Sequence, residues 1–332
     1  MIALVCLDPG GLATIQDRGR FGWQRFGVTP AGPMDRLGFE AAVQLAGCDH
    51  AIELTLFGGR WTVEGGPARL ALAPALAAKV DGAPVPELTT VTLQPGQTLS
   101  LGGGAVRAYL AVEGGFDIAP VLGSRSVHVR SRLGWPGRAL VAGDRIPLSQ
   151  APVAGPERRL PADACDLTAR PVRVVLGPQE DLFTQAGIET FLTETFTVSP
   201  EADRMGYRLD GPVIEHAGDY NLVSDGIVIG SVQVPGNGRP IVLLADRQST
   251  GGYPKIATVI GADLPLIARC KPGDAVRFEA IDVAAARAAT MAFSQRLAAL
   301  ASAVTPAAQS WDQSSERLLG LQLIDGAVSA QP

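Results

Sequence analysis

The chain has 332 residues, a formal net charge of −5 and a pI near 5.3, with 46% hydrophobic and 18% charged residues. This acidic balance and an aromatic content of 5% provide neither a basic field nor stacking platforms, so we expect no nucleic-acid partner. No apolar run approaches the roughly 20 residues of a membrane span, and the first residues lack the segments of a signal peptide. We therefore expect a globular cytoplasmic protein that does not bind membranes.

The first half of the chain predicts short β-strands. Alternating segments such as AIELTL and RWTVEGG lie between glycine and proline turns from residue 2 to about 150. One helix is predicted at about 34–47, ending at Gly47, because apolar residues recur there at helical spacing. Its apolar stripe comprises Leu37, Ala41, Ala42 and Leu45.

The second half begins after a segment at 149–170 that carries three prolines and no periodicity, which predicts a linker. Two short helices are then expected, at about 179–186 and 187–194. Asp282 is expected to cap a long helix. The predicted strands are PVRVVLG at 171–177, TFTVS, and residues 206–209, 241–245, 256–260 and 275–281. The predicted units are an N-terminal β domain at 1–150, a linker at 151–170, a C-terminal β domain at 171–282, a helix at 283–302 and a loose tail at 303–332.

A Pro-Gly turn followed by a strand occurs at 93–103 and again at 270–280, which favours two similar β domains over one continuous sheet. The sequence contains no G-x-x-x-x-G-K-[ST] phosphate loop and no Ala-Met-Lys-Met context for covalent biotin. The four cysteines have no paired spacing, so we expect no metal site and no disulfide. No residues are assigned to a cofactor.

Four polar stretches are candidates for a functional site: residues 14–36, 111–117, 199–212 and 224–257. In the last one, polar side chains flank both ends of the apolar strand at 241–245. Turn chemistry explains the glycines and prolines of this stretch but not its polar residues, each of which would cost about 1–3 kcal/mol if buried without a partner. We predict that the stretch forms the wall of a site. Its polar residues are Asp225, Gln233, Asp246, Gln248 and Thr250.

Four long segments resemble one protein family, over about residues 2 to 280. They are TIQDRGRFGWQRFGVTPAGPMD, AIELTLFGG, DRMGYRLDGP and SDGIVIGSVQVPGNGRPIVLLADRQSTGGYPKIATVI. The family is the carboxyltransferase-like family, which includes the C subunit of bacterial 5-oxoprolinase, the sporulation protein KipA, allophanate hydrolase subunit 2 and the carboxyltransferase domain of urea carboxylase. One departure is RQSTGG, where the family usually has two threonines.

The resemblance implies a mainly β fold with a few helices, in two cyclophilin-like β-barrel domains with a ligand site near their interface. It also implies an ATP-dependent enzyme that opens the lactam of 5-oxoproline to glutamate, with ATP bound by the complex and this chain inactive alone. The partners would be two other chains, the KipI-type B subunit together with the LamB/YcsF-type A subunit. The substrate would be a small anionic lactam or amide.

Residue types then suggest roles in such a site. Arg204 or Arg20 would clamp the carboxylate, amides and a hydroxyl would donate to the lactam oxygen, and Asp225 or Asp246 would accept from the ring N–H. The predicted catalytic residues are Arg204, Gln233, Asp246, Gln248 and Thr250. The predicted substrate-binding residues are Gln16, Arg20, Tyr207, Asp225, Gly251, Gly252 and Tyr253.

Two alternatives stay open. One is a carboxyltransferase subunit that moves CO2 from carboxybiotin, carried by another chain, to urea or a related amide. The other is a KipA-like protein without enzyme activity that antagonises a kinase inhibitor, for which an exposed apolar surface would suffice.

Overall fold

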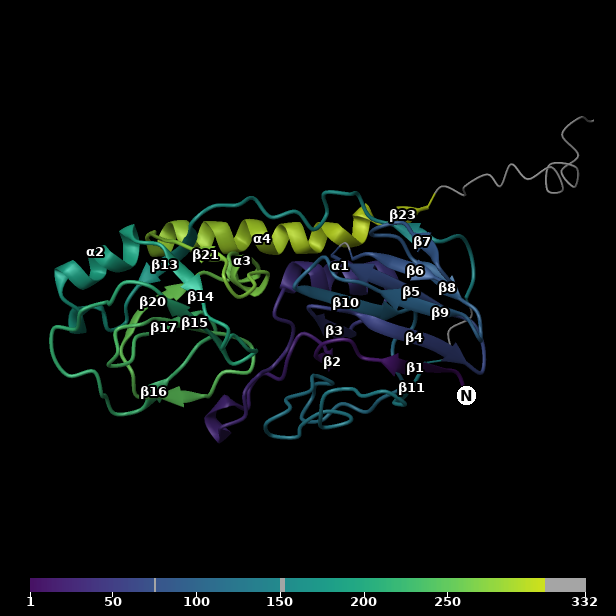
Figure 1. Ribbon diagram of the computed structural model, residues 1–332, viewed down its shortest axis with the longest axis horizontal. Coiled ribbons are helices and arrows are strands. Elements are labelled where there is room, and N and C mark those ends of the chain that lie inside the picture. The colour runs from purple at the N-terminus through teal and green to yellow at the C-terminus, as the bar shows by residue number, and fades with distance from the viewer. Residues whose placement is uncertain (75, 150–152, 308–332) are drawn as a thin grey trace, which may run out of the picture.

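The computed structural model describes residues 1–74, 76–149 and 153–307, and it consists of two β-rich halves placed side by side (Figure 1). Strands dominate both halves, which confirms the predicted fold class. Within the described ranges no helix combines the length and apolar character needed to cross a membrane. The described residues form four α-helices, α1 (Arg36–Ala46), α2 (Gln185–Thr193), α3 (Leu264–Ala268) and α4 (Val283–Ala303).

The N-terminal half contains two antiparallel sheets around one apolar core that includes Leu4, Ile15 and Trp61. The first sheet has the order β11-β1-β4-β9-β6-β7, and the second has the order β2-β3-β10-β5-β8. The strands of the first are β1 (Ala3–Asp8), β4 (Gly59–Glu64), β6 (Ala78–Val80), β7 (Ala83–Val85), β9 (Thr98–Leu101) and β11 (Arg145–Pro147). Those of the second are β2 (Ala13–Gln16), β3 (Ala51–Thr55), β5 (Ala68–Ala73), β8 (Val91–Leu93) and β10 (Arg107–Val112).

Helix α1 covers the outer face of the second sheet. The Asp35 carboxylate accepts hydrogen bonds from the backbone N–H groups of Leu37 and Gly38, and Gly47 ends the helix in the left-handed conformation. The predicted stripe is buried, and most of the remaining helix is buried as well, because α4 contacts its other side. Strand β10 is therefore buried on both faces: Leu110 points into the first core, and Tyr109 packs with α1.

The C-terminal half is built on one eight-stranded sheet with the order β21-β14-β15-β18-β17-β20-β13-β22. All pairings are antiparallel except that of β13 with β22. The two edge strands β21 and β22 are separated by Arg277 alone, so the sheet curls into a nearly closed barrel. The strands are β13 (Val172–Leu176), β14 (Phe196–Val198), β15 (Gly206–Asp210), β17 (Ser231–Gln233), β18 (Ile241–Leu243), β20 (Lys255–Val259), β21 (Ala275–Val276) and β22 (Phe278–Ala280).

A separate two-stranded sheet, β16 (Asp225–Gly226) with β19 (Thr250–Gly251), lies beside the barrel, and we call it the flap. The sequence did not predict the flap or α3. The two short helices expected at 179–194 are one 3-10 turn, η2 (Glu180–Leu182), followed by α2. Asp282 caps α4 as predicted, because its carboxylate accepts from the backbone N–H of Ala285 at 2.7 Å.

The segment predicted as a linker packs against the body of the protein. Leu160 and Cys165 are buried in the cluster around α1, and β12 (Arg158–Arg159) pairs with β23 (Thr305–Pro306). Residues 305–306 are thus paired rather than loose, and the rest of the predicted tail lies outside the described residues from 308 onward. Helix α4 contacts α1 in one half and β13 in the other, and it lies across the top of both in Figure 1.

Candidate functional site

A buried ionic cluster joins the two halves. The Arg204 guanidinium, just before β15, donates to both carboxylate oxygens of Asp246 at 2.9 and 2.8 Å. It also donates to Glu53 of β3 at 2.5 Å and to the carbonyl of Gly32 at 2.8 Å. All three charged side chains have less than a tenth of their surface exposed. The cluster therefore fixes the end of β18 against β3 without access to solvent.

Glu53 is held ionised within this cluster. Burial alone would raise its pKa, but the positive charges of Arg204 and Arg107 and hydrogen bonds from the Met34 N–H and the Tyr109 hydroxyl outweigh burial. The pKa of Glu53 consequently lies below its ordinary value. The positive charge of Arg204 is thus balanced inside the protein.

The other residues predicted from the N-terminal half are also engaged internally. Arg20 donates to the carbonyls of Val121, Ser124 and Ser126, which fastens the loop after β10. Gln16 is fully buried and bridges that loop to the backbone N–H of Gly32. Tyr207 is buried in the barrel, where its hydroxyl accepts from Arg107 and donates to the Ala268 carbonyl. The structure therefore places Arg204, Arg20, Gln16 and Tyr207 in the supporting interior.

The predicted residues of the C-terminal half gather elsewhere, around a pocket of about 280 Å³ on the barrel. Gln233, Gln248 and Tyr253 line it together with Arg208 and Arg130, and Arg130 comes from the N-terminal half. The pocket is thus built from both halves, as expected for a ligand site at a domain interface. Its other lining residues are Glu201, Asp203, Met205, Gly206, Ile241 and Leu243.

Strand register places these side chains in one row. Arg208 lies opposite Ile241, Ile241 opposite Gln233, and Gln233 opposite Lys255, across β15, β18, β17 and β20. Directly opposite residues of antiparallel strands have Cβ atoms about 4.5–5.5 Å apart. A bulge between Val232 and Gln233 adjusts the register at the last pair. The row brings a guanidinium, an amide and an ammonium group together at one end of the barrel.

The flap covers this row. The Gln233 Nε2 atom donates to the Tyr253 carbonyl at 3.3 Å, and it lies 2.7 Å from where a Cβ on Gly251 would be. The Gln248 amide nitrogen lies 3.5 Å from the same point. Only glycine at 251 therefore lets the flap approach the two amides. Of the predicted site residues, Asp225, Thr250 and Gly251 belong to the flap, and Gly252 adjoins it.

Lys255 anchors the flap. Its ammonium group is buried and donates to the Asp225 carboxylate at 3.1 Å, although that carboxylate is largely exposed. This partner lowers the pKa of Asp225. The predicted site residues do not include Lys255, Arg130 or Arg208, although Arg208 lies in the candidate stretch at 199–212. The alternation of Tyr207, Arg208 and Leu209 was the available signal for Arg208, because it turns the arginine outward from the barrel.

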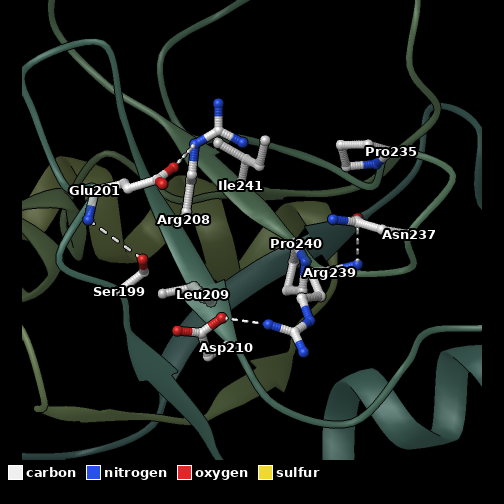
Figure 2. A pocket seen from close by; sticks show the side chains of 10 residues that line it. All are labelled: Ser199, Glu201, Arg208, Leu209, Asp210, Pro235, Asn237, Arg239, Pro240 and Ile241. Carbon is white, nitrogen blue, oxygen red and sulfur yellow. Dashed lines mark hydrogen bonds and ion pairs between the residues drawn. The ribbon is translucent and has the colours of Figure 1, made fainter.

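A smaller hollow of about 200 Å³ adjoins the pocket and shares Glu201, Arg208 and Ile241 with it (Figure 2). Figure 2 shows two ion pairs across its floor, Arg208 with Glu201 at 3.1 Å and Arg239 with Asp210 at 2.6 Å. All four side chains are about half exposed or more. Such pairs exchange readily with an anionic ligand, because an exposed ion pair contributes at most about 1 kcal/mol.

Two further cationic or titratable groups lie buried near the cluster. Among the described residues, neither ring nitrogen of His128 has a hydrogen-bond partner. Burial lowers the pKa of His128, although nearby Asp246 opposes this, and burial lowers the pKa of Arg247 to about 10. No group of three or more potential metal ligands was found among the described residues.

Comparisons with known proteins agree with this architecture. A family model described as "Carboxyltransferase domain, subdomain A and B" matches residues 26–280. The chain is 36% identical to the C subunit of 5-oxoprolinase from Escherichia coli (strain K12), over 83% of this chain and 90% of the relative. It is 34% identical to the Haemophilus influenzae protein of the same name, over 83% of this chain and 91% of that relative. The crystal structure of Kluyveromyces lactis urea carboxylase superposes with a TM-score of 0.82 at 27% identity, covering 90% of this chain but 29% of that one.

Proposed function

This chain belongs to the carboxyltransferase domain family, subdomains A and B, and on that premise we propose that it is the C subunit of an ATP-dependent 5-oxoprolinase. The observation that carries the proposal is the match in length as well as sequence. The 5-oxoprolinase subunits align over about nine tenths of their own length, whereas the urea carboxylase aligns over less than a third. The reaction is the hydrolysis of the lactam of 5-oxoproline to glutamate.

The pocket on the barrel suits such a substrate because it combines cations with amides. 5-Oxoproline is a five-membered lactam with a carboxylate, so its site needs a positive group, a donor for the lactam oxygen and an acceptor for the ring N–H. Arg208 and Arg130 are exposed at the pocket and their carboxylate partners are exposed too, so either can turn to a substrate carboxylate. Gln233 and Gln248 each offer an amide donor and an amide acceptor.

The buried cluster then has a different role from the one predicted. Arg204 is one of the two predicted carboxylate clamps, with Arg20, but its donors are directed to Asp246, Glu53 and a backbone carbonyl. We assign Arg204 and Asp246 to holding the end of β18 in place, where the chain continues to Gln248 and Thr250. Catalysis needs such support, because donors stabilise a developing oxyanion only when they are preorganised.

ATP and the remaining chemistry are assigned to the complex. The sequence has no phosphate loop, and the pocket that holds the amides contains no glycine-rich turn leading into a helix. We propose that two further subunits, one of the KipI type and one of the LamB/YcsF type, complete the enzyme. This chain would bind the substrate and orient its lactam and its carboxylate.

The test is ATP-dependent release of glutamate from 5-oxoproline by this chain alone and by this chain with both partner subunits. We expect activity only in the mixture, and a folded, assembled mixture without activity would refute the proposal. Arg208→Gln should raise KM for 5-oxoproline at least tenfold, since a charge-assisted hydrogen bond is worth about 1.5–3 kcal/mol. Arg239→Gln is the matched control, because Arg239 is similarly exposed and paired but does not line the larger pocket.

A second candidate function is carboxyl transfer from carboxybiotin to urea or a related amide. The superposition with the K. lactis urea carboxylase over 90% of this chain favours it. Urea carries no carboxylate, so the only carboxylate in this reaction is the one that carboxybiotin delivers. Urea-dependent consumption of carboxybiotin, in a mixture that does not hydrolyse 5-oxoproline, would support carboxyl transfer over lactam opening.

A further inference from the structure

A turn of aromatic residues projects from the protein at residues 21–26, and we call it the aromatic turn. It is the purple coil at the lower edge between the two halves in Figure 1, around η1 (Gln24–Phe26). Phe21 is 71% exposed and Phe26 62%, and the Trp23 ring contacts the Phe26 ring at a tilt of 43°, with 5.8 Å between ring centroids. Grouped, exposed aromatic side chains mark interaction sites, where tryptophan and tyrosine dominate binding energies and phenylalanine is also enriched.

The aromatic turn is held rigidly in this projecting position. The Phe26 N–H donates to the Trp23 carbonyl at 2.9 Å, which closes the turn. The Trp23 indole N–H donates to the carbonyl of Leu122 at 3.1 Å, and the Gln24 side-chain amide donates to the carbonyl of Ile227 at 2.7 Å. Both bonds tie the turn to loops that are distant in sequence. A preorganised turn loses little conformational entropy on binding, which favours docking over a passive surface loop.

Further exposed apolar residues lie next to these two hydrogen bonds, one in each half of the protein. Leu122 is exposed beside the Trp23 ring in the N-terminal half, and Val228 is exposed directly after the Gln24 acceptor in the C-terminal half. Ile227 adjoins β16, and its N–H donates to the Ser249 carbonyl beside β19. A body docked on the aromatic turn would therefore also contact the flap over the pocket.

Exposed arginines lie around this surface, although the chain as a whole has a net charge of −5, Arg130 is paired with Asp203, and the flap carries the exposed Asp225 carboxylate. Arg25 is exposed with its guanidinium 4.7 Å from the Phe26 ring centroid. Arg130, at the pocket, and Arg132 are exposed on the neighbouring loop. Charge complementarity therefore calls for an acidic surface on the occupant.

We propose that the aromatic turn docks the KipI-type subunit through an apolar hollow with an acidic rim, and that this contact closes the flap side of the pocket. The inference rests on the proposed function, which supplies the partner. The comparisons are consistent with a permanent neighbour, because one relative is named as part of a multi-subunit enzyme and another is a domain within a longer chain.

Isothermal titration calorimetry measures the dissociation constant between this full chain and the separately purified KipI-type subunit. The variant is Phe21→Ser with Phe26→Ser, and the control is Phe57→Ser, an exposed phenylalanine at 58% in the N-terminal half outside this surface. We expect the double variant to weaken binding at least tenfold, with its melting temperature unchanged because both rings are exposed. The control should bind like the wild type. Binding of the wild type should weaken as salt is raised from about 50 to 300 mM, since exposed charges are screened.

Each other outcome overturns the inference and separates it from the proposed function. If the double variant binds as tightly as the wild type while the mixture hydrolyses 5-oxoproline, the function stands and the docking surface is wrong. If the wild type neither binds the KipI-type partner nor supports hydrolysis, the proposed function fails as well. Loss of self-association in sedimentation, or of binding to anionic vesicles, in the double variant alone would assign the turn to a second copy or to a membrane.

Discussion

Removing the guanidinium of the buried cluster should be among the most destabilising single changes in this protein. Arg204→Met leaves the carboxylates of Glu53 and Asp246 buried without their shared cation, at side chains that are less than a tenth exposed. Breaking a buried ion pair by removing one partner costs about 3–5 kcal/mol. The free energy of unfolding, measured by urea titration at pH 7, should fall by that amount with no large change in its dependence on urea.

The pH dependence identifies the cause. In the wild type the pKa of Glu53 is below its ordinary value, so the cluster's contribution is present above about pH 4.5 and is lost as pH falls through the folded-state pKa. In Arg204→Met the unpaired Glu53 should instead bind a proton more readily in the folded protein. The stability difference between variant and wild type should therefore shrink as pH falls from 7 to 5.

A matched variant separates charge from packing. Arg204→Met combined with Glu53→Gln and Asp246→Asn removes the unpaired charges and should recover at least half of the lost stability at pH 7. A loss below about 1 kcal/mol for Arg204→Met, or a loss that does not change with pH and is not recovered in the triple variant, would refute the argument that buried charge dominates here.

Three other outcomes are expected. Burial raises the pKa of Cys165 to about 12 and those of the other three cysteines to about 11. A thiol reagent at pH 7.5 should therefore modify the native protein slowly and should modify all four thiols after unfolding. Rapid modification of a thiol in the native protein would contradict this. Gly251→Ala should lower kcat/KM of the assembled enzyme at least tenfold, because its Cβ would lie 2.7 Å from the Gln233 amide. Gly226→Ala in the same flap meets no atom within 4 Å and should leave kcat/KM unchanged. Equal effects of the two variants would show that crowding of the Gln233 amide is not the cause. Asp282→Ala should lower the free energy of unfolding by about 1 kcal/mol, because it removes the N-terminal cap of α4. Asp282→Asn should be nearly neutral, because asparagine also caps helices. An unchanged free energy of unfolding in the alanine variant would refute the capping role.

Local patterns predicted the parts of the fold that depend on local physics. The helix ending at Gly47 and the helix starting after Asp282 follow from capping residues next to apolar periodicity, and both occur as predicted. Helix α3 was missed because it has only five residues, too few for a period to show. The packing of 158–170 was hidden by the prolines of the whole segment at 149–170, which predict an irregular backbone but do not say whether that backbone is free.

The candidate site could also be predicted only as far as local sequence patterns reach. Polar residues on both sides of a strand predicted a wall around residues 224–257, and the structure gathers Gln233, Gln248 and the flap there. Residue type alone could not decide which arginine faces solvent. Arg204 and Arg208 lie in one segment, yet Arg204 is paired with two carboxylates that are distant in sequence, and Arg208 lines the pocket. That distinction depends on contacts between residues 53, 204 and 246, which local sequence does not contain.

The closure of the barrel by β21 and β22 constrains how the protein is made. Strand β13 is complete near residue 176, but its parallel neighbour β22 ends at Ala280, about a hundred residues later on the ribosome. One edge of strand β14 likewise stays unpaired until β21 has been synthesised. During translation at about 5–20 residues per second, the C-terminal half therefore exposes two unpaired strand edges for several seconds, at the stage when pairing with another nascent chain competes with its own completion. Mutations that slow the arrival or the pairing of residues 275–280 should then lower the yield of soluble protein more than they lower the stability of the molecules that finish folding.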